Sequence, residues 1–313
     1  MEMNGIATVE KDTRFEGYLL VRQSEQRAAQ NGSRYLDMTL GDKSGEVNAK
    51  CWDGAVPPPP VGTVLKVRGL MQEYNGRNQF RVEKMREANA GDDVDISQLT
   101  LSAPEKPEVM LKQINDTIDA MANEDLQKIC REMLRLSGDA IYYFPAAQKL
   151  HHAERSGLLH HTTGMLDLCN ALLPVYPFLN ADLLRAGVIL HDLSKITEMK
   201  SDEYGNVSDY TAEGLLLGHL VRGVAQVSRA AENVGVSGEI VLLLEHMIIS
   251  HHGEAEFGSP RKPMFAEAEM LHWIDLVDAR MNEMNGIEMR TPKGAFSEKI
   301  WSLDRRVYHP TID

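Results

Sequence analysis

A change in hydrophobic periodicity near residue 90 is the feature that most constrains how this chain folds. Residues 14–86 contain short runs in which polar and apolar side chains alternate or β-branched residues are enriched, with turns at Asp53-Gly54 and Asn75-Gly76. Such runs are typical of strands. From residue 109 onward, apolar residues recur with the 3.6-residue period of an amphipathic helix. The sequence therefore predicts an all-β domain followed by an all-α domain.

The first domain, residues 1–90, is expected to be a small closed barrel. Its five predicted strands are residues 15–21, 33–42, 45–52, 63–74 and 77–85. Five short strands joined by glycine-rich turns are typical of such a barrel. The four prolines at 57–60 cannot sit in a central strand, so we assign them to a loop between strands.

Residues 91–108 are polar and acidic and contain two prolines near their end, which predicts a linker. Residues 109–150 are expected to form a helical connection that begins with an amphipathic helix pair. Residues 151–313 form the second predicted domain. Its helical patterns cover residues 156–173, 180–197, 211–233, 238–251 and 266–284.

Charge is unevenly distributed along the chain, whose formal net charge is −13. Residues 1–90 hold 13 Lys and Arg against 12 Asp and Glu, and the remainder holds 20 against 34. Residues 60–86 contain six basic residues and two acidic ones. The first domain is therefore the part better suited to a polyanionic partner.

Cysteine usage and hydropathy indicate a cytoplasmic protein without a membrane partner. Cys51, Cys130 and Cys169 are far apart, which fits a reducing compartment and argues against a thiolate metal site. The first residues lack the apolar stretch of a secretory signal, and no run has the length needed to span a bilayer.

Histidines cluster in the second domain. All eleven follow residue 150, and most lie in or at the end of apolar helices. Burying so many imidazoles is costly unless each ring nitrogen has a partner, and a metal ion supplies one directly. The clustered histidines are His160, His161, His191, His219, His246, His251, His252 and His272.

The run VILHDLSK at 188–195 places three polar side chains at the end of an apolar helix. Neighbouring helix residues point about 100° apart. His191 and Asp192 can therefore serve one centre only at a helix end, or serve two adjacent ions with Asp192 between them. Lys195 shares their face. Imidazole and carboxylate ligands without thiolate favour manganese, iron, cobalt or zinc.

The ordered set His161, His191-Asp192, His219, His251-His252 and Asp275 resembles the HD superfamily of metal-dependent phosphohydrolases. More closely, nearly the whole chain resembles the YhaM family of bacterial 3′-5′ exoribonucleases, which have an N-terminal OB-fold and a C-terminal HD domain. The segments that carry this resemblance are SGLLHHTTGML, LLRAGVILHDLSK, YTAEGLLLGHLV, LEHMIISHHGEAEFGSP and EAEMLHWIDLVDARMN.

The resemblance implies a metal-ligand set and a role for each neighbouring residue. It implies that Asp278 supports the site from the helix face, that His160 lies at the rim, and that His246 and His272 are core or supporting residues. Ser194 stands where the family has glycine. The implied ligands are His161, His191, Asp192, His219, His251, His252 and Asp275. We expect two divalent ions, manganese first, with cobalt, iron or zinc as alternatives.

Asp192 and Lys195 are the expected catalytic residues. Asp192 would bridge the two ions, and Lys195 would stabilise charge on the phosphate.

The barrel is expected to bind a single strand by stacking and charge, as OB-folds do. Alternation in YNGRNQFR assigns Phe80 to the core, and the position of Trp52 is left open between core and surface. The predicted nucleic-acid-binding residues are Tyr35, Trp52, Tyr74, Arg77 and Arg81.

The leading hypothesis is a 3′-5′ exonuclease that degrades single-stranded RNA to nucleoside monophosphates, and single-stranded DNA stays open as a second substrate. The polarity follows from the resemblance alone. Two alternatives stay open: hydrolysis of a small or cyclic nucleotide with a regulatory barrel, and single-strand binding without catalysis. Self-association is a further open alternative, because the sequence does not locate a surface for it.

Overall fold

Two units divide the chain, Met1–Ser102 and Ala103–Asp313. The structure is a computed structural model that describes residues 5–29, 32–89 and 91–312. None of the helices formed by these residues is both long and apolar enough to cross a membrane.

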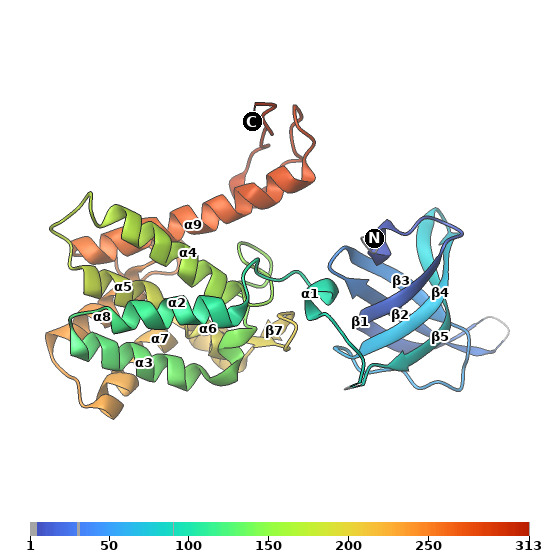
Figure 1. Cartoon of the computed structure of the whole chain (residues 1–313), viewed down its shortest axis with the longest axis horizontal. Coiled ribbons are helices and arrows are strands. Elements are labelled where there is room, and N and C mark those ends of the chain that lie inside the picture. Colours follow the sequence, from blue (N-terminus) through green and yellow to red (C-terminus); the bar gives the residue numbers. More distant parts are fainter. Residues whose placement is uncertain (1–4, 30–31, 90, 313) are drawn as a thin grey trace. The chain divides into compact units, whose positions relative to one another are not determined.

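The first unit is a closed five-stranded barrel with the strand order β1-β2-β3-β5-β4 (Figure 1). Its strands are β1 (Arg14–Ala28), β2 (Arg34–Asp42), β3 (Gly45–Cys51), β4 (Val64–Tyr74) and β5 (Arg77–Glu87). β3 and β5 pair in parallel, and the remaining pairs are antiparallel. A five-stranded Greek-key barrel of this kind is an OB-fold. The five predicted strands are thus confirmed, and the proline run lies between β3 and β4.

Alternation along each strand builds the barrel core. In β2, Leu36, Met38 and Leu40 point inward and are almost fully buried. Phe80 is fully buried and packs edge to face against Phe15, with ring centroids 6.0 Å apart. The prediction that Phe80 belongs to the core is confirmed. Each large side chain buried in this way stabilises the fold by about 1.5–3 kcal/mol.

The segment after β5 carries the short helix α1 (Ile96–Leu99), so part of the predicted linker is ordered. Asp95 caps α1 by accepting a hydrogen bond from the Ser97 amide at 3.0 Å. The carbonyl of Gln98 accepts a hydrogen bond from the amide of Lys43 at 2.8 Å, which ties α1 to the barrel.

The second unit is helical, as predicted, and adds one short hairpin. Its long helices are α2 (Pro107–Asp119), α3 (Glu124–Ser137), α4 (Gly157–Leu172), α5 (Ala181–Leu190), α7 (Ala212–Val234), α8 (Glu239–Ser250) and α9 (Ala266–Arg290). The helix predicted over 180–197 is interrupted, because α5 ends at Leu190 and a four-residue helix, α6 (Lys195–Glu198), follows a turn. The hairpin of β6 (Met199–Ser201) and β7 (Val207–Tyr210) was not expected.

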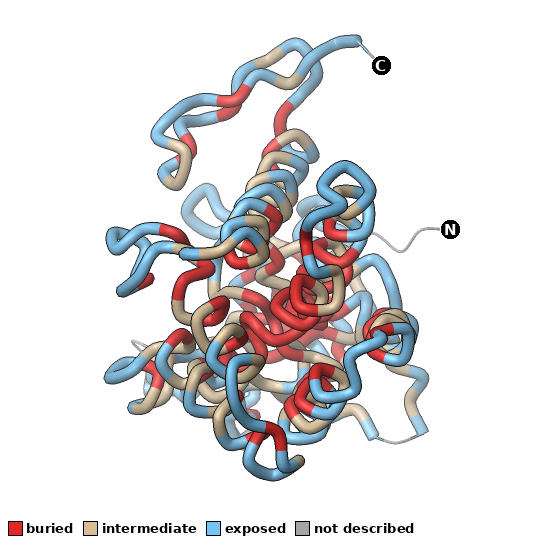
Figure 2. Tube along the Cα trace, turned by 90° about the vertical axis from the view of Figure 1, so that its left-hand side faces the viewer, coloured by how far each residue is buried: buried red, intermediate tan, exposed pale blue. Residues whose placement is uncertain are grey.

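Helix α5 lies at the centre of this unit and contacts α3, α4, α8 and α9. Its residues from Leu183 to Leu190 are buried except Arg185, which explains why its sequence is apolar almost all round. In Figure 2 the buried stretches gather in the interior of the helical unit, whereas the segment leading to the C-terminus is mostly exposed. α5 therefore ends inside the core, where the next two residues, His191 and Asp192, are polar.

Candidate metal centre and barrel surface

His191 and Asp192 follow the last turn of α5 and are buried. The Nδ1–H of His191 donates to the carbonyl of Val188 at 2.8 Å. That bond fixes the ring orientation and directs Nε2 into the centre of the helical unit. The end of a buried helix thus delivers an imidazole and a carboxylate to the same point.

Helix α4 supplies His161, which is completely buried. Its Nε2 lies 3.2 Å from Nε2 of His191 and 3.3 Å from Oδ1 of Asp275 on α9. Its Nδ1 lies 2.7 Å from Oδ2 of Asp278, one turn further along α9. A Cβ atom at Gly164 would lie 2.4 Å from Oδ1 of Asp278, so only glycine lets this carboxylate approach α4 so closely.

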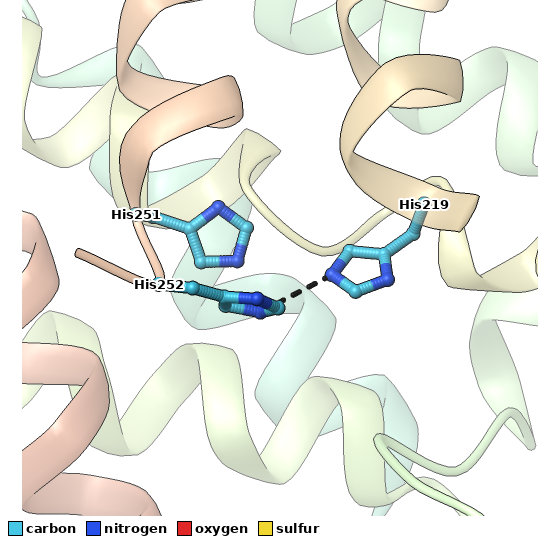
Figure 3. Close-up of side chains that lie close together, drawn as sticks. All are labelled: His219, His251 and His252. Carbon is cyan, nitrogen blue, oxygen red and sulfur yellow. Dashed lines mark hydrogen bonds between the residues drawn. The ribbon is translucent and has the colours of Figure 1, made fainter. Parts of the chain in front are cut away.

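Three histidines approach from the opposite side, and Figure 3 shows their rings directed toward a shared space. The Nε2 atoms of His219 and His252 are 3.3 Å apart. The Nδ1 atoms of His251 and His252 donate to the carbonyls of Ile248 and Phe257 at 2.8 and 2.7 Å. Each Nε2 of these two rings is therefore left with a lone pair that faces the centre.

Helix α7 is bent where it presents His219. Gly218 adopts φ 69° and ψ 167°, a conformation inside α7 that is reserved for glycine. The bend frees the His219 amide, which donates to Oε1 of Glu198 at 3.0 Å. Both carboxylate oxygens of Glu198 also lie 3.1 Å from Nδ1 of His219. Glu198 therefore holds His219 by its backbone and its ring.

Asp192 lies between the two groups of histidines. Its Oδ2 is 3.3 Å from Nε2 of His191, and its Oδ1 is 3.5 Å from Nε2 of His219 and 3.7 Å from that of His251. Oδ1 of Asp192 and Nε2 of His251 are buried and have no hydrogen-bond partner among the described residues. Unsatisfied buried acceptors of this kind are costly, and cations bound by imidazole and carboxylate would satisfy them.

Lys195 is the counter-charge of this cluster. Its Nζ lies 2.6 Å from Oδ2 of Asp192, and both side chains are buried. Burial alone would raise the pKa of Asp192, but the charges of Lys195 and His191 outweigh it and lower that pKa well below its usual value. Asp192 therefore remains a carboxylate, the form that binds metals.

The histidines differ in the charge they carry. Burial lowers the pKa of His252 to about 3 and that of His251 below its usual value, so both are neutral near pH 7. For His161, burial acts in the same direction, but Asp275 and Asp278 outweigh it and raise the pKa to about 9. A metal ion and a proton therefore compete for Nε2 of His161.

The structure brings the seven predicted ligands together. Together they are called the metal cluster below: His161, His191, Asp192, His219, His251, His252 and Asp275. His272 lies outside it and donates from Nδ1 to the carbonyl of His251 at 2.8 Å. His246 accepts a hydrogen bond from the amide of Met264 at 3.0 Å. Ser194 donates to the carbonyl of His219 at 2.7 Å, so the serine hydroxyl has a partner within the fold.

Glu198 and His151 lie beside the metal cluster and were missed by sequence reasoning. Glu198 lies one turn after Lys195, a spacing that places both on one face of a helix and could have been noticed. His151 comes from a loop, and its ring centroid lies 5.6 Å from that of His161. Burial and the charge of Lys195 lower the pKa of His151 to about 3. No periodic pattern marks a loop residue of this kind.

On the barrel, the predicted nucleic-acid-binding residues share one outer face. The rings of Tyr35 and Trp52 lie 4.8 Å apart at 31°, and the ammonium of Lys50 lies 5.1 Å from the Tyr35 centroid. Trp52 is 54% exposed, which settles its position on the surface. Lys50 on β3 is directly opposite Arg81 on β5. Aromatic rings and cations therefore meet on the outer surface of adjacent strands.

Tyr74 and Arg77 extend this face toward the β4–β5 turn. They are cross-strand partners, and both are exposed. A surface depression beside them is also lined by Asn48 and Gln79, whose side chains hydrogen-bond at 2.9 Å. The outer face defined by Tyr35, Lys50, Trp52, Tyr74, Arg77 and Arg81 is called the aromatic–basic face below.

Comparison with known proteins gives matches to both units. The HD domain family matches residues 158–280, which include the whole metal cluster. The 3′-5′ exoribonuclease YhaM of Geobacillus sp. strain WCH70 is 41% identical over 312 residues, or 98% of this chain and 95% of that protein. The YhaM protein of Listeria monocytogenes serovar 1/2a is 41% identical over 301 residues, or 95% of each chain.

Among solved structures, the second OB-fold domain of replication protein A from Methanococcus maripaludis is 12% identical. The similarity covers 29% of this chain and 98% of that domain at a TM-score of 0.24, too low to add to the topology of the barrel itself.

Proposed function

The chain belongs to the YhaM family of 3′-5′ exoribonucleases, and from this premise we propose that it removes nucleoside monophosphates from the 3′ end of single-stranded RNA. We propose further that the metal cluster holds two divalent ions, with manganese as the preferred ion, and that Asp192 bridges them.

The position of Asp192 is the observation that carries this proposal. Its two oxygens face two separate groups of imidazoles, and one of these oxygens has no hydrogen-bond partner among the described residues. His161, His191 and Asp275 would hold one ion on the Oδ2 side. His219, His251 and His252 would hold the other on the Oδ1 side. The Nδ1–H groups of all five rings donate to carboxylate or carbonyl oxygens, which keeps their Nε2 atoms directed inward.

Divalent ions bound here would supply Lewis-acid activation of water and of a phosphodiester oxygen. The protein contributes the alignment and the charge. Lys195 donates one N–H to Asp192 and has two further donors, which suits it to a phosphoryl oxygen that gains charge during hydrolysis. Fixed groups of this kind need no reorganisation during the reaction, so they lower the barrier more than mobile water does.

The aromatic–basic face supports binding of the strand to the barrel. Stacking on Tyr35, Trp52 and Tyr74 tolerates any base, as an exonuclease that must accept any strand requires, and Arg77 and Arg81 suit the backbone phosphates. Because the barrel and the helical unit belong to one chain, a strand held by the barrel has a raised effective concentration at the metal cluster. Since stacking does not read the sugar, we include single-stranded DNA as a second substrate.

Cys51, Cys130 and Cys169 are buried and unpaired, which supports a reducing compartment, and we place the activity in the cytoplasm. We also propose that copies of this chain associate with one another. Measuring the molecular mass of the protein in solution tests this proposal.

Replacing Asp192 by Asn tests the proposed function. The experiment follows a single-stranded RNA labelled at its 5′ end, incubated with Mn²⁺. The unaltered protein is expected to shorten the strand one nucleotide at a time from the 3′ end and to release monophosphates. Asp192→Asn is expected to reduce the rate by about 100-fold or more, because the carboxylate between both ions is lost.

Asp116→Asn is the matched control, since Asp116 is an exposed partner of Lys112 on α2 and should leave the rate unchanged. The same assay with cyclic dinucleotides and nucleoside triphosphates separates the alternatives. Hydrolysis of these small molecules without shortening of the strand would replace the nuclease proposal. Binding of the strand without cleavage in any divalent ion would reduce the protein to a single-strand-binding protein.

A further inference from the structure

Beside the metal cluster, a second group of potential ligands converges on one point. His152 and Glu154 come from the loop that precedes α4, and His160 lies in the first turns of α4. Nδ1 of His152 lies 3.1 Å from Nδ1 of His160, which in turn lies 2.6 Å from Oε1 of Glu154. The third distance, from Nδ1 of His152 to Oε1 of Glu154, is 3.7 Å. These three side chains are called the loop triad below.

Asp278 determines which nitrogen of His152 is available. Its Oδ2 lies 2.7 Å from Nε2 of His152 and also 2.7 Å from Nδ1 of His161. At these distances the carboxylate oxygen accepts a hydrogen bond from each ring. Nδ1 of His152 therefore carries a lone pair, which lies 3.1 Å from Nδ1 of His160 and 3.3 Å from Nδ2 of Asn282, a donor that an ion at this nitrogen would displace.

The loop triad repeats the pattern found at the metal cluster. The nitrogen pairs His161–His191 and His219–His252 lie 3.2 and 3.3 Å apart, and the His152–His160 pair lies at 3.1 Å. In each group the opposite ring nitrogen of at least one histidine is fixed by a carboxylate. A histidine that donates its other N–H to a carboxylate is the usual arrangement of a metal ligand.

Backbone contacts fix the conformation of His152 in its loop. His152 has φ 49°, in the left-handed region that is unfavourable for a residue with a Cβ. Its amide donates to Oδ1 of Asn282 at 3.0 Å, and its carbonyl accepts from the amide of Ala146 at 3.1 Å. A Cβ atom at Gly157 would lie 2.0 Å from that carbonyl, so glycine is required for the loop to approach α4. A strained residue fixed by several contacts is typical of a functional site.

We propose that the loop triad is a third divalent metal site, in which Nδ1 of His152, Nδ1 of His160 and a carboxylate oxygen of Glu154 bind one ion. Two imidazoles and a carboxylate suit Zn²⁺, Fe²⁺, Co²⁺ or Mn²⁺. The His160 side chain is 28% exposed, so water completes the coordination and the ion exchanges with solvent. Asp278 connects this site to the metal cluster because one oxygen orients a ligand of each.

The site differs from the metal cluster in what it touches. Asp192 and Lys195 belong to the other side of His161, and the loop triad makes no hydrogen bond to either in the part of the chain described. We therefore assign the third ion a structural role, in which it adds a link between the loop and His160 on α4. The number of ions expected at the metal cluster depends on the proposed function. The proposal of a metal ion in the loop triad does not depend on it.

Anomalous X-ray diffraction from crystals of the whole protein soaked in Mn²⁺ or Zn²⁺ tests this site directly. The expected result is a peak between His152, Glu154 and His160, in addition to those at the metal cluster. Metal analysis after equilibrium dialysis should then give one equivalent more than the metal cluster holds. A crystal with saturated peaks at the metal cluster and none in the loop triad would leave a hydrogen-bonded triad only and overturn the proposal.

Two variants separate the sites. The double variant Glu154→Gln, His160→Gln is expected to lose the loop-triad peak and one equivalent of metal while it keeps the metal cluster filled. Asp192→Asn is expected to show the reverse, with the loop triad occupied and the metal cluster depleted. If the double variant instead retained the full equivalent of metal, the ion would have other ligands and the assignment would be wrong. A filled loop triad in a protein without nuclease activity would reject the proposed function and keep the third site.

Discussion

At the scale of single residues, the candidate centre depends on carboxylates that each serve two partners. Asp192 faces two groups of imidazoles, and Asp278 accepts from two histidines that belong to different groups. A carboxylate that contacts two side chains couples their orientations. If the carboxylate moves toward one side chain, its contact with the other is lost. Supporting residues of metal ligands typically affect metal affinity or activity by about 10–100-fold when replaced.

Asp278→Asn should separate positioning from binding. The amide keeps the shape of the carboxylate but loses its charge, so His161 is oriented less firmly and its nitrogen is a weaker ligand. We expect the Mn²⁺ concentration for half-maximal activity to rise by about 10–100-fold. Excess Mn²⁺ should restore much of the rate, unlike in Asp192→Asn.

The measurement is the initial rate of RNA degradation over a Mn²⁺ titration, with Asp116→Asn as the control. An unchanged metal requirement in Asp278→Asn would show that His161 keeps its orientation without the carboxylate.

At the scale of elements, the ends and bends of helices position the ligands. α5 ends just before His191, α8 ends just before His251, and α7 bends at Gly218 immediately before His219. Helix ends release side chains and backbone groups from the regular spacing of the helix, so adjacent residues can point to one centre. This explains why the ligand pairs His191-Asp192 and His251-His252 are adjacent in sequence.

Gly218→Ala tests the role of the bend in α7. At φ 69° and ψ 167° a Cβ is strongly disfavoured, so we expect a loss of about 1–3 kcal/mol in the free energy of unfolding. Because relief of this strain would turn His219 away from Asp192, metal affinity and nuclease rate should fall as well. Thermal unfolding and Mn²⁺ binding measure the two effects.

Gly235→Ala is the matched control at the other end of α7. Gly235 has φ 73° and ψ 27° and caps the helix, so alanine there should cost about 1–2 kcal/mol without changing Mn²⁺ binding. Equal loss of metal affinity in both variants would assign the effect to helix stability in general.

At the scale of the whole molecule, our proposal assigns binding of the strand to the barrel and hydrolysis to the helical unit. The barrel carries the aromatic–basic face and a nearly balanced charge, whereas the excess of acidic residues lies after residue 90. An acidic surface repels a polyanion, so a separate binding unit has a physical purpose. Binding of long strands and hydrolysis should therefore respond to different substitutions.

Trp52→Ala in the full chain tests this division. Loss of one stacking ring is worth about 1–3 kcal/mol per base, so the KM for a long single strand should rise by roughly 10-fold or more. The kcat should stay close to that of the unaltered protein, because Trp52 lies outside the helical unit. Fluorescence anisotropy with labelled RNA and steady-state kinetics measure both quantities.

Trp301→Ala is the control, since Trp301 is 85% exposed in the C-terminal segment. A fall in kcat without a change in KM for Trp52→Ala would contradict a binding role for the barrel face.

The sequence by itself determined the class of each unit and the identity of the candidate ligands. Periods of two and 3.6 report which side chains are buried, so the five strands, the helices and buried Phe80 follow from local pattern. A histidine beside a carboxylate at a helix end is also recognisable from local sequence. The resemblance to a known family supplied the other candidate metal ligands.

Only the tertiary structure decided how these residues face one another. It turned the two oxygens of Asp192 to different histidines, paired Lys195 with Asp192, and brought Glu198 to His219. It also brought together His152, Glu154 and His160 from a strained loop and a helix. Such contacts depend on where helices end, on close approaches at glycines and on packing between segments far apart in the chain. These features leave no periodic pattern in the sequence, so periodicity could not predict the contacts.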